Sequence, residues 1–344
     1  MDITELLAFS VKKGASDLHL SAGLSPRLRL DGDVQLINLP PMTHEQVHSL
    51  IYGIMNDKQR RHFDEYLEAD FAFEAPDIGR FRVNAFNQHR GAAAVFRAIA
   101  SDILTIQQLN LPDLFRQIST LPRGLVLVTG PTGSGKSTTL AAMVDHINEH
   151  RQAHIITIED PIEFIHQSKK CLVNQRQVHR DTLSFDAALR AALREDPDVI
   201  LVGELRDLAT IRLALTAAET GHLVLGTLHT ASAATTIDRI VDVFSAGEKA
   251  MIRLMLSESL KAVLAQILVK KIGGGRIAAH EIMLGTPAIR HLIREAKAAQ
   301  MYSVIQTGGG LGMKTLDQCL RNLVDNLVIS ADVAREEARS PENF

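Results

Sequence analysis

The sequence predicts an α/β protein in which a small α+β domain precedes a core with a mostly parallel sheet and a mainly helical C-terminal region. Two observations support this prediction. Short continuous apolar runs alternate with helical patterns from residue 124 to 241, as in parallel sheets that helices cover on both faces. Before residue 100, several short segments have the pattern of antiparallel strands. We expect domains at 1–100, 123–270 and 271–344, with a linker at 101–122.

Caps and turns define the expected elements of the first domain. Residues 3–13 have apolar positions at helical spacing, which predicts a helix. The pair Asp31-Gly32 lies inside an alternating segment and favours a hairpin, because both central positions of the tight turn need positive φ. Thr43 and Gln46 are spaced as a capping box for a second helix. A third helix is expected at 58–67, followed by strands in FAFEA, FRVNAF and AAAVFRAI.

Strands and helices alternate through the core in a fixed order. The expected strands are GLVLVTG, HIITIED, DVILVGE and HLVLGTLH, and the expected helices are 136–149, 184–195, 207–219 and 232–241. The later segment ILVKKIGGGRIAAHEIM is expected to form a short β-hairpin. From residue 247 onward the rest of the chain is expected to be mainly helical.

Composition disfavours several classes of protein. The 37 basic and 40 acidic residues give a net charge of −3, and aromatic residues are 4% of the chain, so a nucleic-acid partner is not expected. Cys171 and Cys319 are too far apart for a CxxC motif, so no structural zinc is expected. The sequence has no signal peptide and no apolar run of the ~20 residues that span a bilayer. We therefore expect a cytosolic or peripheral protein.

A glycine-rich loop follows the first strand of the core. Its sequence GPTGSGKST matches the phosphate-binding pattern G-x-x-x-x-G-K-[ST] and comprises Gly130, Pro131, Thr132, Gly133, Ser134, Gly135, Lys136, Ser137 and Thr138. The glycines let backbone N–H groups point at phosphates, Lys136 reaches the β- and γ-phosphates, and the Ser137 hydroxyl can ligate Mg²⁺. This motif, in its strand-to-helix context, predicts a P-loop NTPase that binds ATP with Mg²⁺.

Acidic and titratable residues follow the other predicted strands of the core. Because ligands bind beyond the carboxyl ends of parallel strands, Asp160, Glu204 and His229 are expected near the phosphates. Asp160 is equally well interpreted as a helix N-cap, and His229 as an ordinary buried histidine. His222 begins its strand and should lie farther away.

The position of Glu204 has a more specific interpretation. Asp207 is better placed than Glu204 to cap the next helix, and Gly203 stands where a Walker B aspartate would be. Glu204 is therefore expected to orient and deprotonate the attacking water, or to hold magnesium through a water.

Four segments together resemble the secretion ATPase superfamily, which serves type II and type IV secretion and type IV pili. GPTGSGKST, ITIEDPIEF, DVILVGELRD and TAAETGHLVLGTLHT resemble its Walker A, Asp box, atypical Walker B and His box in order and spacing. GASDLHLS and FRVN…VFR resemble its N-terminal domain. The resemblance covers most of the chain. It implies a RecA-like core, a PAS-like N-terminal domain and a homohexameric ring with nucleotide held between the two domains.

The resemblance also implies roles for single residues. Glu204 would be catalytic, with Glu163 of the Asp box assisting at the metal or the water. The resemblance implies that Arg82 and Arg97 sense the γ-phosphate, whereas the sequence alone favours surface positions for these strand arginines. His222 and His229 would couple the nucleotide state to neighbouring subunits.

Within the superfamily, the chain is similar to the branch that retracts type IV pili. It starts almost at once with the small domain, and it lacks the four-cysteine zinc motif of the assembly and secretion enzymes. AIRHLIRE resembles the AIRNLIRE motif associated with retraction, with His291 in place of Asn; the matching residues are Ala288, Ile289, Arg290, Leu292, Ile293, Arg294 and Glu295. The same segment can be an amphipathic helix whose three apolar residues pack inward.

The implied function is an ATP-hydrolysing motor for pilus retraction and twitching motility. It would work at the cytoplasmic face of the inner membrane, associated only peripherally, and act on an inner-membrane platform protein. A pilus-assembly or secretion ATPase, a nucleotide-gated adaptor that hydrolyses little, and a DNA-translocating motor are the alternatives.

Overall fold

The computed structural model describes residues 2–30, 32–99 and 102–344. Contacts divide the chain into two compact units. The first unit comprises residues 1–102 and the short segment 161–165, and the second comprises 103–160 and 166–344. Each unit has a sheet and a buried apolar core of its own.

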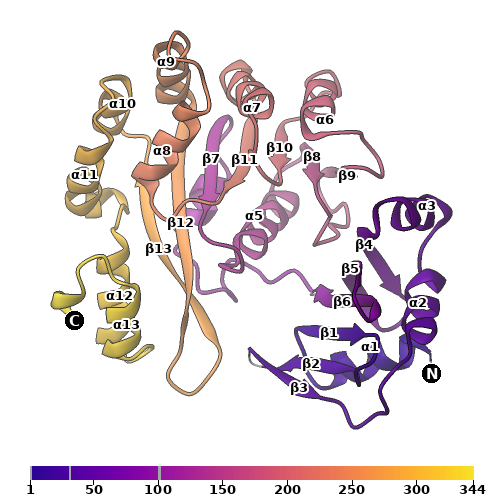
Figure 1. The fold of residues 1–344 in the computed structure, drawn as a ribbon. Helices are drawn as coiled ribbons and strands as arrows, with labels where there is room; N and C mark the ends of the chain where they lie inside the picture. Colours follow the sequence, from indigo (N-terminus) through magenta and orange to yellow (C-terminus); the bar gives the residue numbers. More distant parts are fainter. Residues whose placement is uncertain (1, 31, 100–101) are drawn as a thin grey trace. The chain divides into compact units, whose positions relative to one another are not determined.

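The first unit contains an antiparallel sheet with the strand order β3-β2-β1-β6-β5-β4 (Figure 1). Its strands are β1 (Asp17–Ser21), β2 (Arg27–Leu30), β3 (Asp33–Leu36), β4 (Glu68–Ala75), β5 (Gly79–Gln88) and β6 (Gly91–Ile99). Its helices are α1 (Ile3–Lys12), α2 (His44–Gly53) and α3 (Asp57–Tyr66). This confirms the expected α+β architecture.

Local hydrogen bonds explain where these helices begin. The expected capping box is confirmed, because Gln46 N donates to Thr43 Oγ1 at 3.3 Å and Thr43 N donates to Gln46 Oε1 at 2.8 Å. The expected hairpin is present as β2 and β3, but Asp31 of its turn lies outside the described residues. Strand β1 was not expected; it is central in the sheet, because its buried Leu18 pairs with Leu28 of β2 on one side and with Phe96 of β6 on the other.

The second unit contains a mostly parallel sheet with the strand order β13-β12-β7-β11-β10-β8-β9. Its strands are β7 (Gly124–Thr129), β8 (His154–Glu159), β9 (Leu172–Gln177), β10 (Val199–Val202), β11 (Leu223–Leu228), β12 (Leu260–Lys270) and β13 (Arg276–Leu284). Only β13 runs antiparallel to its neighbour. The parallel sheet predicted from the alternating pattern is therefore confirmed.

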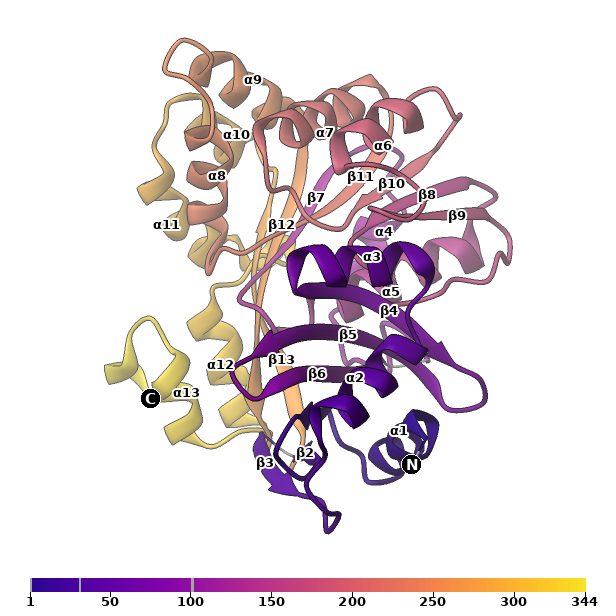
Figure 2. The ribbon, with the colours of Figure 1, turned by 45° about the vertical axis from the view of Figure 1, so that its right-hand side comes forward.

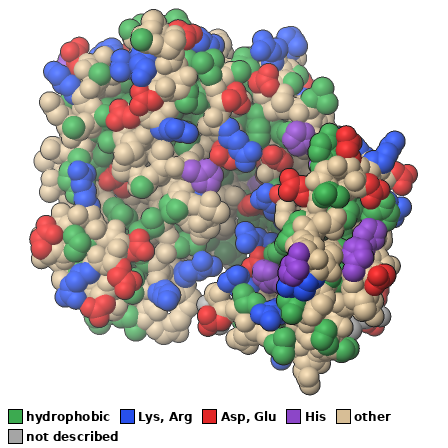
Figure 3. Space-filling view, in the orientation of Figure 1, with side chains coloured by type: hydrophobic (Ala, Val, Ile, Leu, Met, Phe, Trp, Pro, Cys, Tyr) green, Lys and Arg blue, Asp and Glu red, His purple; other side chains and the backbone are tan. Residues whose placement is uncertain are grey.

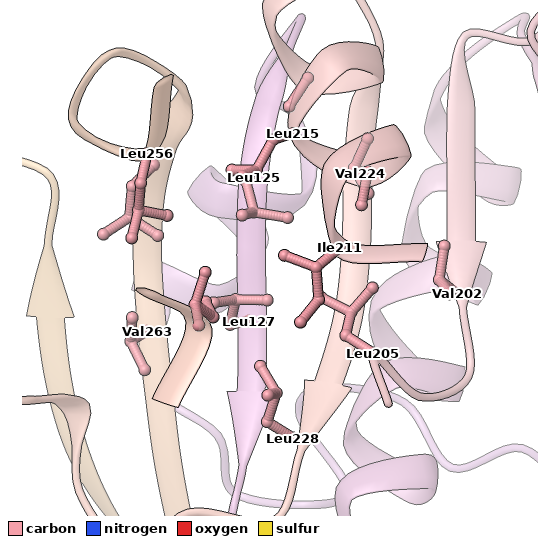
Figure 4. Close-up of a cluster of buried hydrophobic side chains, with 14 of the residues drawn as sticks. Leu125, Leu127, Val202, Leu205, Ile211, Leu215, Val224, Leu228, Leu256 and Val263 are labelled. Atoms are coloured by element: carbon pink, nitrogen blue, oxygen red, sulfur yellow. The ribbon is translucent and has the colours of Figure 1, made fainter. Parts of the chain in front are cut away.

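Helices cover both faces of this sheet (Figures 1 and 2). One face packs against α4 (Leu114–Ser119) and α5 (Lys136–His150). The other packs against α6 (Phe185–Ala192), α7 (Leu208–Thr220), α8 (Ala233–Asp242), α9 (Lys249–Ser259) and α10 (Pro287–Arg294). Figure 4 shows how Leu125, Leu127 and Val224 from the strands meet Ile211 and Leu215 of α7 in the second of these layers. Burial of this apolar surface is the main stabilising term for the unit.

Three features of the second unit differ from the expected boundaries. The expected linker at 101–122 contains the buried residues Ile106, Phe115 and Ile118, which pack in the same cluster as β7 and α5, so its described part belongs to the core. The expected core ended at residue 270, but β13 pairs with β12 over nine positions and continues the sheet. Strand β9 was missed because its sequence LVNQRQ has no apolar run and lies at the sheet edge.

The chain ends in the expected helical region, which follows β13. Besides α10 it contains α11 (Met301–Thr307), α12 (Leu316–Asp325) and α13 (Ala331–Glu337). Leu320 and Ala334 from this region pack against Val269 and Ala279 of the β12–β13 hairpin. Across the described residues, no helix is both long enough and apolar enough to cross a bilayer.

Candidate nucleotide-binding site

The glycine-rich loop joins the end of β7 to the start of α5, as the motif requires. Gly130 has φ 145°, and a Cβ atom at this position would overlap the carbonyl oxygen of Gln266. Gly135 precedes α5 as its N-cap in the left-handed region, with φ 84°. The loop conformation therefore depends on residues without side chains, and it leaves the first backbone N–H groups of α5 available to an anion.

Lys136 is a nearly buried cation at the start of α5, with 9% of its surface exposed. Its ammonium donates hydrogen bonds to the carbonyl oxygens of Gly130 at 2.8 Å and Pro131 at 2.9 Å. It also lies 3.4 Å from Nδ1 of His229. Buried charge needs such partners, and phosphate oxygens are stronger partners for an ammonium than neutral carbonyls.

Glu204 follows β10, and its side chain is 22% exposed. One carboxylate oxygen accepts a hydrogen bond from Arg206 Nε at 2.7 Å, and the other lies 3.4 Å from His229 Nε2. The sheet order β7-β11-β10 places the ends of these strands next to one another. His229 therefore connects Glu204 to Lys136, and the predicted proximity of Glu204 to the phosphate loop is supported.

The residues around Glu204 resolve two of the open alternatives. Asp207 caps α7, because it accepts hydrogen bonds from the backbone N and the hydroxyl of Thr210, both at 2.9 Å. Asp160 caps no helix; its carboxylate lies 3.9 Å from the guanidinium of Arg206. Arg206 thus connects two strand-end carboxylates, Asp160 and Glu204.

The two histidines of the predicted site lie at opposite ends of β11. His229 follows the strand beside the loop, whereas His222 precedes the strand and its Nδ1 is 2.9 Å from the carbonyl oxygen of Ala217 at the end of α7. A six-residue strand is about 20 Å long. Within this chain, His222 therefore lies away from the loop, and its suggested coupling role remains a prediction.

Arg82, Arg97 and Glu163 belong to the first unit. Arg82 donates to Asp70 at 2.6 Å, and Arg97 donates to Asp17 at 2.8 Å, so each guanidinium has a carboxylate partner within that unit. Both arginine side chains are well exposed, at 42% and 62%. Their sensing role, and the role of Glu163 beside the metal or the water, remain predictions.

The segment AIRHLIRE forms helix α10, and its three apolar residues Ile289, Leu292 and Ile293 are buried. Arg290 donates to the carbonyl oxygen of Gly285 at 2.9 Å, and Arg294 lies 3.4 Å from Glu258 on α9. Ala288, His291 and Glu295 are exposed. The amphipathic interpretation is therefore correct, and it leaves a polar face on the surface.

The oxygen donors beside the loop are of the kind that magnesium prefers. Ser137 is the second residue of α5 and is exposed. His229 lies between the Glu204 carboxylate and the ammonium of Lys136, the residue before Ser137, and is 3.4 Å from each. In the described part of the chain, no three His, Cys, Asp or Glu side chains are arranged to hold an ion. Because Mg²⁺ bound with nucleotides takes few protein ligands and several phosphate or water oxygens, Ser137 and Glu204 fit such an ion.

Two residues of the site were missed from the sequence. Arg206 binds both strand-end carboxylates, and Gln266 of β12 is buried against the phosphate loop. Gln266 has a detectable signal, because it is a single amide within the apolar run AVLAQILV of a strand. Arg206 has none, since a charged residue after a strand is common on protein surfaces.

A comparison with known protein families covers most of the chain. Residues 1–274 match the family described as type II/IV secretion system protein. The chain belongs to this family. A relative that matches it over the full length of both chains is an ATPase, and with its own phosphate loop the chain is an ATPase of the family.

Several individual relatives of the chain are pilus proteins. It is 72% identical over 344 residues to the type IV pilus retraction ATPase PilT of Pseudomonas aeruginosa, covering 100% of both chains. It is 60% identical to a twitching motility protein of Neisseria gonorrhoeae, covering 99% of this chain and 92% of the relative. A crystal structure of the pilus retraction motor PilT with bound ADP superposes with a TM-score of 0.92 at 46% identity, covering 100% of this chain and 99% of that one.

Proposed function

We propose that this chain is an ATP-driven motor that retracts type IV pili and thereby powers twitching motility. The observation that supports this most is the 72% identity, over the whole of both chains, with a pilus retraction ATPase. The site geometry agrees with ATP hydrolysis, because Lys136, His229 and Glu204 form a continuous chain of contacts beside the phosphate loop.

The arrangement of these residues suggests how hydrolysis proceeds. The backbone N–H groups of the loop and the Lys136 ammonium hold the β- and γ-phosphates. Glu204 orients a water molecule and accepts its proton as the water oxygen attacks the γ-phosphorus and the bond to ADP breaks. Magnesium, held by Ser137 and Glu204 directly or through water, would neutralise charge on the phosphate oxygens. His229 contacts both the Lys136 ammonium and the Glu204 carboxylate. A change in these contacts when the γ-phosphate leaves can therefore be transmitted by His229 to the segment that follows β11.

The mechanical output requires more than one chain. We infer a homohexamer in which nucleotide lies between the two domains, with Arg82 and Arg97 sensing the γ-phosphate and Glu163 assisting at the metal or the water. His222 and His229 would pass the nucleotide state to neighbouring subunits. The ring would act on an inner-membrane platform protein from the cytoplasmic face of that membrane.

Deletion of the gene, followed by complementation, tests this proposal. Cells without the chain should carry surface pili yet fail to twitch, because pili are assembled but not withdrawn. Wild-type protein should restore twitching, whereas Glu204→Gln, which replaces the carboxylate with an amide of the same shape, should not. Bald cells would instead assign the chain to pilus assembly. A purified protein that binds ATP without releasing phosphate would identify a nucleotide-gated adaptor.

A nucleic-acid motor has little support from the surface. Basic and acidic side chains are intermixed over the described part of the face shown in Figure 3, and the chain has a net charge of −3. Binding to a nucleic-acid backbone needs a concentrated positive surface.

A further inference from the structure

Gln266 is a buried amide on the strand beside the phosphate loop. Strand β12 runs parallel to β7, and Ala265 pairs with Thr129, the last residue before the loop. Gln266 therefore stands level with the start of the loop, although it lies more than a hundred residues later in the sequence. Only 2% of its surface is exposed.

Both ends of the amide group are used. Nε2 of Gln266 donates a hydrogen bond to the carbonyl oxygen of Ser134 at 2.6 Å. Oε1 accepts a hydrogen bond from the hydroxyl of Thr139 at 2.9 Å. Ser134 is in the middle of the loop and Thr139 lies in the first turn of α5, so one side chain joins the two segments that flank Lys136.

The partners are themselves buried, which makes the bridge specific for an amide. Ser134 and Thr139 are each 3% exposed. An apolar side chain at position 266 would leave a buried carbonyl and a buried hydroxyl unpaired, and an ionised carboxylate would have no hydrogen to donate to Ser134. The backbone of Gln266 adds a second constraint, because its carbonyl oxygen occupies the space that a side chain at Gly130 would need.

The loop must be held in its binding shape before nucleotide arrives. Backbone N–H groups bind phosphate well only when they already converge, since ordering the loop on binding would reduce affinity. We propose that Gln266 is a positioning residue that holds the phosphate loop against α5 and so prepares Lys136 and the loop N–H groups for ATP. This role depends on the ATPase activity of the proposed function, but not on the pilus as its output.

Two variants remove the bridge from opposite sides. Gln266→Leu keeps a similar volume without hydrogen bonds, and Thr139→Val replaces the hydroxyl with a methyl group of similar shape. Each should raise the KM for ATP about five- to tenfold, because one buried hydrogen-bonded link is lost, and each should change kcat less than KM. Titration of the full-length protein with ADP and Mg²⁺ should show the same loss of affinity.

Rescue and coupling distinguish positioning from a general loss of stability. Thr139→Ser restores the hydroxyl and should recover most of the affinity lost in Thr139→Val. In the double variant of Gln266→Leu and Thr139→Val, the fold-increase in KM should be smaller than the product of the two single increases, because both substitutions remove the same bridge. Val269→Ala, three residues along β12 and packed against Leu320, is the matched control; it should lower Tm while leaving the KM within about twofold of the parent, since distant sites do not couple.

The outcomes separate this inference from the proposed function. An unchanged KM in Thr139→Val, even if Gln266→Leu does not fold, would overturn the role of the bridge. An increase in KM in Val269→Ala as large as in Gln266→Leu would also overturn it. A parent protein that neither binds nor hydrolyses ATP would refute the proposed function, and the role of Gln266 with it; a parent active on ATP with unaffected variants would refute only the bridge.

Discussion

At the scale of single residues, the site depends on charges that have partners at the end of a buried sheet. Val199–Val202 are all buried, and Glu204 comes two residues later with Arg206 and His229 as its partners. A carboxylate at the edge of a core is unfavourable when unpaired, so these contacts explain how it can be kept there.

Removing the charge of Glu204 should separate binding from hydrolysis. Glu204→Gln keeps the shape of the side chain but cannot accept the water proton, so ATP hydrolysis should fall by about 100-fold or more while ADP affinity changes little. Phosphate release and ADP titration measure the two effects. Glu195→Gln, which removes an equal charge from a surface pair with Arg176, is the control and should keep the parental rate.

The buried His280 should make stability sensitive to acid. Burial, and to a lesser degree Lys314, lower the pKa of His280 to about 3, whereas the unfolded histidine has a pKa of 6.5. Between these values the unfolded chain binds a proton that the folded chain does not, so stability is present above pH 6.5 and is lost as the pH falls. The loss should be about 1.4 kcal/mol per pH unit below pH 6.

Urea unfolding of the parent and of His280→Leu from pH 7 to pH 5 tests this effect. The difference in unfolding free energy between the two proteins should shift steadily in favour of the variant as the pH falls. Ile211→Val removes one buried methylene in a different apolar cluster and leaves the surroundings of His280 unchanged, so its difference from the parent should stay constant. A constant difference for His280→Leu would contradict the assignment.

At the scale of helices and strands, hydrogen bonds at helix N-termini and buried side chains hold the functional segments in place. Glu281 of β13 is buried, and its carboxylate accepts hydrogen bonds from the first backbone N–H groups of α8, at Ala233, and of α12, at Leu316. Burial raises the pKa of this carboxyl. One side chain thus connects the helix after the His229 segment to the C-terminal region, and the two helix N-termini stabilise its charge.

Two substitutions in helix α10 should distinguish its contribution to folding from its suggested contribution to pilus retraction. Ile293 is almost fully buried, so Ile293→Ala should lower the unfolding free energy by about 2–5 kcal/mol. Arg294 forms an exposed pair with Glu258, so Arg294→Ala should lower it by less than about 1 kcal/mol. Urea unfolding measures both.

The second variant then tests the suggested retraction role of this segment. Arg294→Ala should keep its ATPase rate but reduce twitching in complemented cells. Full twitching by a stable Arg294→Ala protein would limit AIRHLIRE to a structural role. Ala299→Ser, at an exposed position just beyond α10, is the control and should keep full twitching.

At the scale of the whole molecule, each unit has a buried core of its own, whereas the expected site includes residues from both units. The phosphate loop, Glu204 and His229 belong to the second unit, whereas Arg82, Arg97 and Glu163 belong to the first. If the site is completed by assembly into a ring, hydrolysis must depend on the concentration of the chain.

The ATPase rate per chain should therefore rise as the protein assembles. We expect an increase of at least about fivefold across the range in which sedimentation shows larger species to form, by mass action. Arg82→Ala and Arg97→Ala should reduce the rate of the assembled form. The same rate per chain at concentrations where only monomer sediments would contradict the need for a ring.

Local pattern by itself determined much of this protein. The phosphate loop, the capping box at Thr43, the N-cap at Asp207 and the strand ending before Glu204 all depend on residues close in sequence. The placement of Glu204 beside the loop also followed, because the carboxyl ends of parallel strands meet at one edge.

Only the tertiary structure decided how distant segments meet. The bridge from Gln266 to Ser134 and Thr139, and the contacts of His229 with both Lys136 and Glu204, depend on the order β12-β7-β11-β10. Local periodicity specifies that a strand is buried but not which strand lies beside it, so neither contact could be found from the sequence. The polar edge strand β9 and the extension of the sheet by β13 were settled in the same way, by hydrogen bonds to a neighbouring strand.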